Sequence, residues 1–228
     1  MEQFFNNLLF GIYPYVALSI LVIGSVVRYE RDPYTWKAGS SQLLRRKQLI
    51  WGSVLFHVGV LSIFAGHFVG LLTPLWVWEM VGLSHTGKQL TAMVAGGLAG
   101  VFGIIGTSIL IHRRFFDARV RATSSFADNA IILILWLQFA LGLSTIFVSA
   151  QNLDGEEMLK LVGWTQSIFT FNPDAVSYIA DVAPIFKAHI FLGLTIFVLF
   201  PFTRLVHMLS APIRYIWRTG YQIVRTKR

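Results

Sequence analysis

Five long apolar stretches alternate with short polar connections along this chain. They cover about residues 4–27, 49–71, 90–111, 127–148 and 183–209. About 20 consecutive apolar residues are enough for a helix to cross the apolar core of a bilayer, and each stretch reaches that length. The pattern therefore predicts an all-α membrane protein with five transmembrane helices.

The composition agrees with this class and limits the chemistry. Of the 228 residues, 55% are hydrophobic and only 13% are charged, which exceeds the apolar content that a soluble domain uses. The connections are too short for a second domain, so we expect one integral domain over residues 1–228, with any large catalytic machinery on another polypeptide. Cysteine is absent, which excludes iron–sulfur clusters and thiolate zinc sites from this chain.

The basic residues are distributed unevenly between the connections, although the formal net charge of the whole chain is +8. Most lie in the first connection, the third connection and the C-terminal tail: Arg28, Arg31, Lys37, Arg45, Arg46, Lys47, Arg113, Arg114, Arg119, Arg121, Arg214, Arg218, Arg225, Lys227 and Arg228. The second and fourth connections carry only Lys88 and Lys160. Because cytoplasmic loops are rich in Lys and Arg, we expect the N-terminus outside and the C-terminus in the cytoplasm. The charge then indicates contact with acidic membrane lipid or a partner subunit, and nucleic acid is not needed to explain it.

Glycines recur in two of the predicted helices. Gly52, Gly59 and Gly66 are spaced by seven residues, which suits either room for a porphyrin plane or a helix-packing groove. The small residues of stretch 96–106 favour close packing of the third helix. In the longest connection, the apolar periodicity of residues 158–164 predicts a short helix lying on the outer surface.

Four of the six histidines lie inside the predicted spans, where a histidine is costly and usually functional. His57 and His67 fall on the second helix, and His189 and His207 on the fifth. On straight helices, His57 and His67 would lie about 15 Å apart along the axis, and His189 and His207 would lie about 27 Å apart. Because these helices run in opposite directions, His57 should meet His207, and His67 should meet His189. The unequal spacing requires a bend, and Pro201 is a sufficient cause.

Two facing imidazoles are the ligand set of a six-coordinate b-type haem, which is suited to electron transfer because no open position remains on the iron. The chain has no Cys-x-x-Cys-His motif, so attachment is expected to be non-covalent. A zinc or copper site is disfavoured, because two pairs separated along the helix axis do not converge on one small ion. The four histidines thus predict two non-covalent haem b groups.

Several runs of this sequence, in this order, resemble the gamma subunit of membrane-bound respiratory nitrate reductases over nearly the whole chain. They are Tyr13-Pro14-Tyr15, Leu55-Phe56-His57, Gly66-His67-Phe68, Leu72-Thr73-Pro74, Arg119-Val120-Arg121-Ala122-Thr123, Leu159-Lys160-Leu161-Val162-Gly163-Trp164 and Phe200-Pro201-Phe202-Thr203-Arg204-Leu205-Val206-His207. The resemblance implies a cytochrome b subunit in a bacterial inner membrane that oxidises a quinol, either menaquinol or ubiquinol. It further implies that electrons pass to an iron–sulfur beta subunit and then to a molybdenum-containing alpha subunit, which reduces nitrate on the cytoplasmic side.

The same resemblance implies roles for individual residues. The family's haem ligands fall on the two histidine pairs named above, and its quinol-site lysine aligns with Lys88. Gly66, His67 and Gly70 would form part of the quinol pocket beside the outer haem. Position alone favours another interpretation of Lys88, a cation that extends to the membrane interface.

Basic residues near the histidines are candidate partners of the haem propionates. Arg114 matches a basic residue that the family associates with the inner haem, and Arg204 lies one turn before His207. Lys187, beside His189, is a further candidate at the outer haem. The two remaining histidines, His85 and His112, are interpreted as surface residues.

Two alternative functions stay open at this point. A dihaem membrane subunit of a sulfite- or heterodisulfide-linked quinone oxidoreductase complex has the same fold and haem pairs but a different partner. A non-redox membrane anchor or transporter is the second alternative, and it would show no b-type spectrum. The quoted runs favour the nitrate reductase type.

Overall fold

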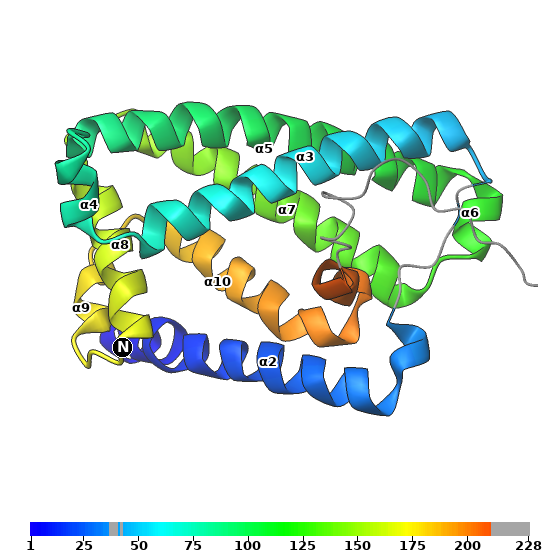
Figure 1. The fold of residues 1–228 in the computed structure, drawn as a ribbon, viewed down its shortest axis with the longest axis horizontal. Helices are drawn as coiled ribbons and strands as arrows, with labels where there is room; N and C mark the ends of the chain where they lie inside the picture. The colour runs from blue at the N-terminus through cyan, green and yellow to red at the C-terminus, as the bar shows by residue number, and fades with distance from the viewer. Residues whose placement is uncertain (37–40, 42, 211–228) are drawn as a thin grey trace, which may run out of the picture.

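The computed structural model describes residues 1–36, 41 and 43–210, and these form helices and turns without a strand (Figure 1). Lys37 and the basic tail residues named above lie outside the described residues. The elements are α1 Glu2–Asn6, η1 Asn7–Ile12, α2 Tyr13–Arg31, η2 Pro33–Thr35, α3 Arg46–Leu72, α4 Leu75–Met80, α5 His85–Phe116, α6 Ala118–Ala122, α7 Phe126–Ser149, α8 Glu156–Phe169, α9 Ala175–Ile179, α10 Pro184–Leu199, η3 Phe200–Phe202 and η4 Arg204–Ser210.

Five helical segments of the described chain are long and apolar enough to cross a membrane, which confirms the predicted fold class. They are 2–31, built from α1, η1 and α2, then α3, α5 and α7, and finally α10 continued by η3. The first four extend beyond the predicted apolar stretches because polar residues start or end them. At the start of α7, for example, Ser125 and Asp128 form a reciprocal capping box that satisfies free backbone N–H groups.

The fifth helix is shorter than the predicted stretch 183–209. It ends at Leu199, a 3-10 turn follows around Pro201, Thr203 is extended, and His207 lies on the separate 3-10 segment η4. Pro201 has no backbone N–H and cannot continue the helix. Arg28 donates from Nη1 to the carbonyl oxygens of Pro201 at 2.6 Å and Thr203 at 2.9 Å, so the carbonyl groups freed by the break have a partner.

The long helices pack in a row in which neighbours in space are not always neighbours in sequence. α3 packs against α5, α5 against α7, α7 against α10, and α10 against α2 (Figure 1). The contact of α3 with α5 is so close that a Cβ atom on Gly59 would lie 2.4 Å from the backbone nitrogen of Gly103. Gly52 and Gly59 therefore serve helix packing, as the small residues of the third helix were predicted to do, whereas a Cβ on Gly66 would meet nothing within 4 Å.

The helix predicted at residues 158–164 is longer than expected, and its position on the outer surface of the membrane stays a prediction. α8 runs from Glu156 to Phe169 and buries one face that includes Val162 and Trp164. The Trp164 indole donates to the Phe10 carbonyl at 2.9 Å, and the Gln166 amide donates to two carbonyls at the end of α3. α8 thus ties the first and second transmembrane segments together at one end of the molecule.

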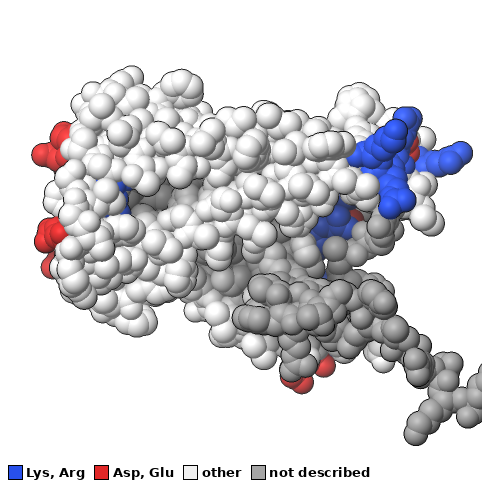
Figure 2. Space-filling view, turned by 45° about the horizontal axis from the view of Figure 1, so that its top comes forward, with Lys and Arg blue, Asp and Glu red and all other residues white. Residues whose placement is uncertain are grey.

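Charged side chains separate toward the two ends of the molecule. In Figure 2, a broad uncharged band lies between one end where Lys and Arg predominate, with some Asp and Glu among them, and the other end, where patches of Asp and Glu are exposed. We call the first the arginine end, defined by Arg28, Arg113, Arg114 and Arg204, and the second the Lys88 end, where α4, α8 and α9 lie. At the arginine end, a hydrogen bond from Arg45 lowers the pKa of the Asp117 carboxyl group, which caps α6. This separation agrees with the predicted orientation, which remains a prediction.

Candidate functional site

The four candidate ligand histidines form the two pairs that the antiparallel argument predicts, although His207 lies on η4, beyond the end of the fifth spanning segment at Phe202. The ring centres of His57 and His207 are 6.2 Å apart, and those of His67 and His189 are 6.1 Å apart. The first pair lies toward the arginine end and the second toward the Lys88 end, because His57 precedes His67 on α3 while α10 runs the other way. Each pair joins one ring from α3 to one ring from the last transmembrane segment or η4.

Three of the four rings are held by a carbonyl group of their own segment. Nδ1 of His57 lies 2.7 Å from the Ser53 oxygen, Nδ1 of His67 lies 2.9 Å from the Ile63 oxygen, and Nδ1 of His207 bonds to the Arg204 oxygen. A ring nitrogen that donates to a carbonyl carries the proton, so the lone pair is on Nε2. Metal-binding histidines commonly use this arrangement, in which the second nitrogen fixes the ring.

The spacing within each pair fits two ligands on opposite sides of one iron. A bond between a metal and an imidazole nitrogen is about 2 Å long, and that nitrogen lies roughly 1.15 Å from the ring centre, so two such rings have centres about 6.3 Å apart. The separations in the two pairs are close to this value. In the described part of the chain, no three His, Cys, Asp or Glu side chains gather around a possible bare ion. Two-histidine sites therefore suit a haem, whose porphyrin supplies the other four donors.

The space beside His67 is open on the α3 side. A Cβ atom on Gly66 or on Gly70 would meet no atom of the described chain within 4 Å. Both residues were predicted to line the quinol pocket. Their position next to the His67–His189 pair agrees with room for a flat ligand there, and their role in binding quinol stays a prediction.

Lys88 is buried and does not extend to the surface. Only 5% of it is exposed, and its Nζ atom has no hydrogen-bond partner among the described residues. The ammonium group lies 5.2 Å from the centre of the Trp78 ring, and the Trp78 indole nitrogen is likewise buried without a partner. The interface interpretation of Lys88 is therefore wrong. Two hydrogen-bond donors without a partner in the described part of the chain thus lie close together at this end of the molecule.

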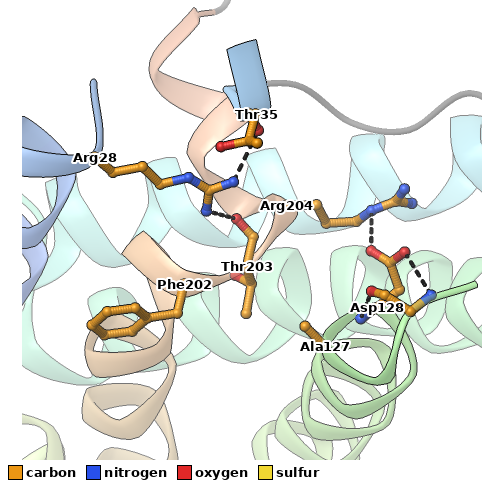
Figure 3. A pocket seen from close by; sticks show the side chains of 8 residues that line it. Arg28, Thr35, Ala127, Asp128, Phe202, Thr203 and Arg204 are labelled. Atoms are coloured by element: carbon orange, nitrogen blue, oxygen red, sulfur yellow. Dashed lines mark hydrogen bonds and ion pairs between the residues drawn. The ribbon is translucent and has the colours of Figure 1, made fainter. Parts of the chain in front are cut away.

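Arg114 and Arg204 meet at one carboxylate at the arginine end. The Asp128 carboxylate lies 2.8 Å from Nε of Arg204 and 3.5 Å from Nη1 of Arg114. Arg204 and Asp128 also line a pocket of about 250 Å³, together with Arg28, Thr35, Ser125, Ala127, Phe202 and Thr203 (Figure 3). The predicted contact of Arg114 and Arg204 with haem propionates stays a prediction. Lys187, the third candidate, donates to the Ala180 oxygen at 2.7 Å and to the Asn6 side chain at 3.4 Å.

Sequence reasoning missed Trp78, Asp128 and Gln138, which lie against the predicted site residues in the structure. Asp128 carried a signal, because an acidic residue three positions after Ser125 is a capping-box pattern at the start of a predicted helix. Gln138 carried a weaker one, as a polar amide in the middle of an apolar stretch. Trp78 lies in a connection, where nothing in the sequence indicated that its ring contacts Lys88.

Comparisons with known proteins match the chain over its full length. The sequence model of the family described as nitrate reductase gamma subunit matches residues 6–227. The respiratory nitrate reductase 1 gamma chain of Escherichia coli K12 is 51% identical over 225 residues, 99% of each chain. The respiratory nitrate reductase 2 gamma chain of the same organism is 50% identical over 228 residues, the whole of both chains.

The alternative function, a subunit of a heterodisulfide-linked complex, is supported by a distant relative. The Hdr-like menaquinol oxidoreductase cytochrome b-like subunit of Archaeoglobus fulgidus is 25% identical over 262 residues, 88% of this chain and 76% of that one. The identity to the two gamma chains is twice as high. The comparisons therefore favour the nitrate reductase type, as the quoted runs did.

Proposed function

The chain belongs to the nitrate reductase gamma subunit family, and we propose that it holds two haem b groups, oxidises quinol on the outer side of the membrane and passes the electrons to an iron–sulfur subunit. Members of this family are the membrane cytochrome b subunits of nitrate reductase complexes, so this chain is an electron-transfer subunit whose nitrate site belongs to a partner. The five apolar helices fit a subunit of the bacterial inner membrane.

The observation that carries the proposal is the presence of two facing histidine pairs, His57–His207 and His67–His189. Their ring centres are 6.1 and 6.2 Å apart, and three of the four rings bond through Nδ1 to backbone carbonyls, which leaves the lone pair on Nε2. Two haems, when bound, supply the one-electron relay, with entry at the His67–His189 site and exit at the His57–His207 site. The protein's part is to hold each imidazole rigidly at iron distance and to surround it with apolar side chains.

Quinol oxidation is proposed beside Lys88 and the His67–His189 pair. A buried ammonium group without a hydrogen-bond partner among the described residues is costly and favours an oxygen ligand, because a hydrogen bond or a negative charge offsets its burial. Lys88 would donate to one quinol oxygen and stabilise the negative charge that develops as that oxygen loses its proton. Gly66 and Gly70 leave room for the ring, because no atom fills the space that a side chain there would occupy.

The partner subunits are proposed to bind at the arginine end. The excess of basic residues there favours the cytoplasmic side, where an iron–sulfur beta subunit would take electrons from the His57–His207 site and deliver them to a molybdenum-containing alpha subunit. Because electrons move inward while protons from quinol stay outside, turnover would build a membrane potential. The distribution of charge is the support for this orientation.

Single histidine variants test the haem assignment directly. In membranes that hold the complete complex, His189→Ala should remove one of two b-type components from the reduced-minus-oxidised spectrum, and His207→Ala should remove the other. His112→Ala is the matched control, because His112 is exposed and, among the described residues, its ring bonds to Gln48 and stacks on Phe116, away from both histidine pairs. The haem assignment is contradicted if His189→Ala or His207→Ala keeps both components at full intensity.

A further inference from the structure

His189 differs from the other three candidate haem ligands in what holds its ring. The rings of His57, His67 and His207 each bond through Nδ1 to a carbonyl of their own segment. Nδ1 of His189 is buried and has no hydrogen-bond partner among the described residues. Something other than its own helix must therefore orient this ring.

The neighbouring helix α7 supplies the contacts that α10 does not. Gln138 donates from Nε2 to the backbone oxygen of His189 at 3.1 Å, and the same atom lies 3.5 Å from Nε2 of the His189 ring. Gly142, one helical turn further along α7, contacts this ring closely, because a Cβ atom there would be 3.0 Å from Cε1 of His189. Gln138 and Gly142 thus form one surface against which the imidazole lies.

The chain also makes room for the Gln138 amide. Gly193 lies one turn after His189 on α10, and a Cβ atom at Gly193 would be 3.2 Å from Nε2 of Gln138. A side chain there would press on the amide. The two glycines, one on each helix, therefore allow the ring of His189 and the amide of Gln138 to approach each other inside the membrane.

At the contact between Gln138 and His189, one hydrogen-bond acceptor and one ring nitrogen lack a partner among the described residues. Oε1 of Gln138 is a buried acceptor without a partner among the described residues, and Nδ1 of His189 is a buried nitrogen that carries a proton whenever Nε2 is a metal ligand. An unpaired buried donor or acceptor destabilises the folded state, because it has lost its hydrogen bonds to water and gained none in the protein. The structure does not form a hydrogen bond between these two atoms, and one such bond would satisfy both groups.

We propose that Gln138 is the positioning residue of His189, with Oε1 accepting the Nδ1–H of the ring while Nε2 stays on the His189 carbonyl. This inference rests on the proposed haem at His67 and His189. The amide replaces, for this one ligand, the backbone carbonyl that fixes the other three rings. An acceptor on the second nitrogen makes an imidazole a stronger electron donor to the metal, so it stabilises ferric over ferrous iron.

Two variants with opposite expected effects test the inference in the purified complex, by redox titration of the two b-type components and by their electron paramagnetic resonance signals. Gln138→Leu removes the acceptor and should raise the midpoint potential of the component that is lost in His189→Ala. Gln138→Glu supplies a stronger acceptor and should lower it. The second component should keep its potential in both. Ser144→Ala on the same helix is the control, because the Ser144 hydroxyl donates to the Ala140 oxygen within α7 and has no other hydrogen bond among the described residues.

The outcomes separate this inference from the haem assignment. Opposite shifts of one component support it, as does loss of that component in the Leu variant together with a lowered potential in the Glu variant. Unchanged potentials, shifts of the same sign, or loss of the component in both variants would overturn it. If His189→Ala keeps both b-type components, the proposed haem site itself is refuted. If His189→Ala loses one component while the Gln138 variants keep wild-type midpoint potentials, the positioning role of Gln138 alone is refuted.

Discussion

Lys88→Met replaces the buried ammonium group of Lys88 with an apolar side chain of similar length. Lys88 is 5% exposed, and its Nζ atom has no hydrogen-bond partner in the described chain, so the substitution breaks no hydrogen bond of the protein itself. Burying an unpaired charge costs several kcal/mol, more than the roughly 0.5–2 kcal/mol of its contact with the Trp78 ring. The variant should therefore fold at least as well as the wild type and keep both haems.

The expected loss lies in the reaction with quinol. A hydrogen bond to a charged group contributes about 1.5–3 kcal/mol, and each 1.4 kcal/mol or so changes a rate tenfold, so electron entry from quinol should slow by about 10- to 150-fold. The assay is stopped-flow reduction of the b-type haems by a soluble quinol analogue, followed optically in the complete complex. Chemical reduction by dithionite measures haem content in the same samples.

A second lysine at the same end provides the matched control for Lys88→Met. Lys160 is partly exposed and lies 3.9 Å from Glu157 on its own helix, so Lys160→Met removes the same charge without touching the proposed pocket. It should leave quinol-driven reduction unchanged. The reasoning is refuted if Lys88→Met reduces its haems at the wild-type rate, or if it loses haem, since the residue would then serve the fold.

Three further predictions concern packing, the helix break and the pocket. Gly59→Ala should lower the free energy of unfolding by about 1–3 kcal/mol, measured by thermal denaturation of the purified complex, because its Cβ would overlap the backbone of Gly103. Arg28→Met leaves carbonyls of the helix break without their donor, so it should weaken or shift the b-type component assigned to His207 and leave the other component unchanged in a redox titration. Trp78→Phe keeps the ring but loses the indole N–H, so haem content should be normal and quinol-driven reduction slower than wild type, by less than in Lys88→Met; an unchanged rate would exclude the indole from the pocket.

The sequence sufficed for the helices and for the pairing of the histidines, because both follow from periodicity and chain direction. Bilayer thickness sets helix length, and opposite helix directions leave one sensible pairing of His57, His67, His189 and His207. Contacts to Arg28 were not predictable in this way. A proline predicts a bend but not its form, and the 3-10 segment that carries His207 depends on which donor reaches the freed carbonyls.

Whether a polar side chain is buried could not be predicted from the sequence. Lys88 lies at the edge of an apolar stretch, where an exposed and a buried position have the same local pattern, and its burial depends on Trp78 from the preceding connection. The glycines of α3 show the same limit. Gly52, Gly59 and Gly66 are equivalent in spacing, yet two of them contact α5 and the third faces open space.

The central claim is that this subunit carries two haems, placed between quinol and a nitrate-reducing partner. A redox-titrated optical spectrum of the isolated complex, recorded first with added quinol and then with added nitrate, tests it most directly. The account predicts two b-type components, both reduced by quinol and both reoxidised by nitrate. A single component, or two components that nitrate leaves reduced, would contradict it.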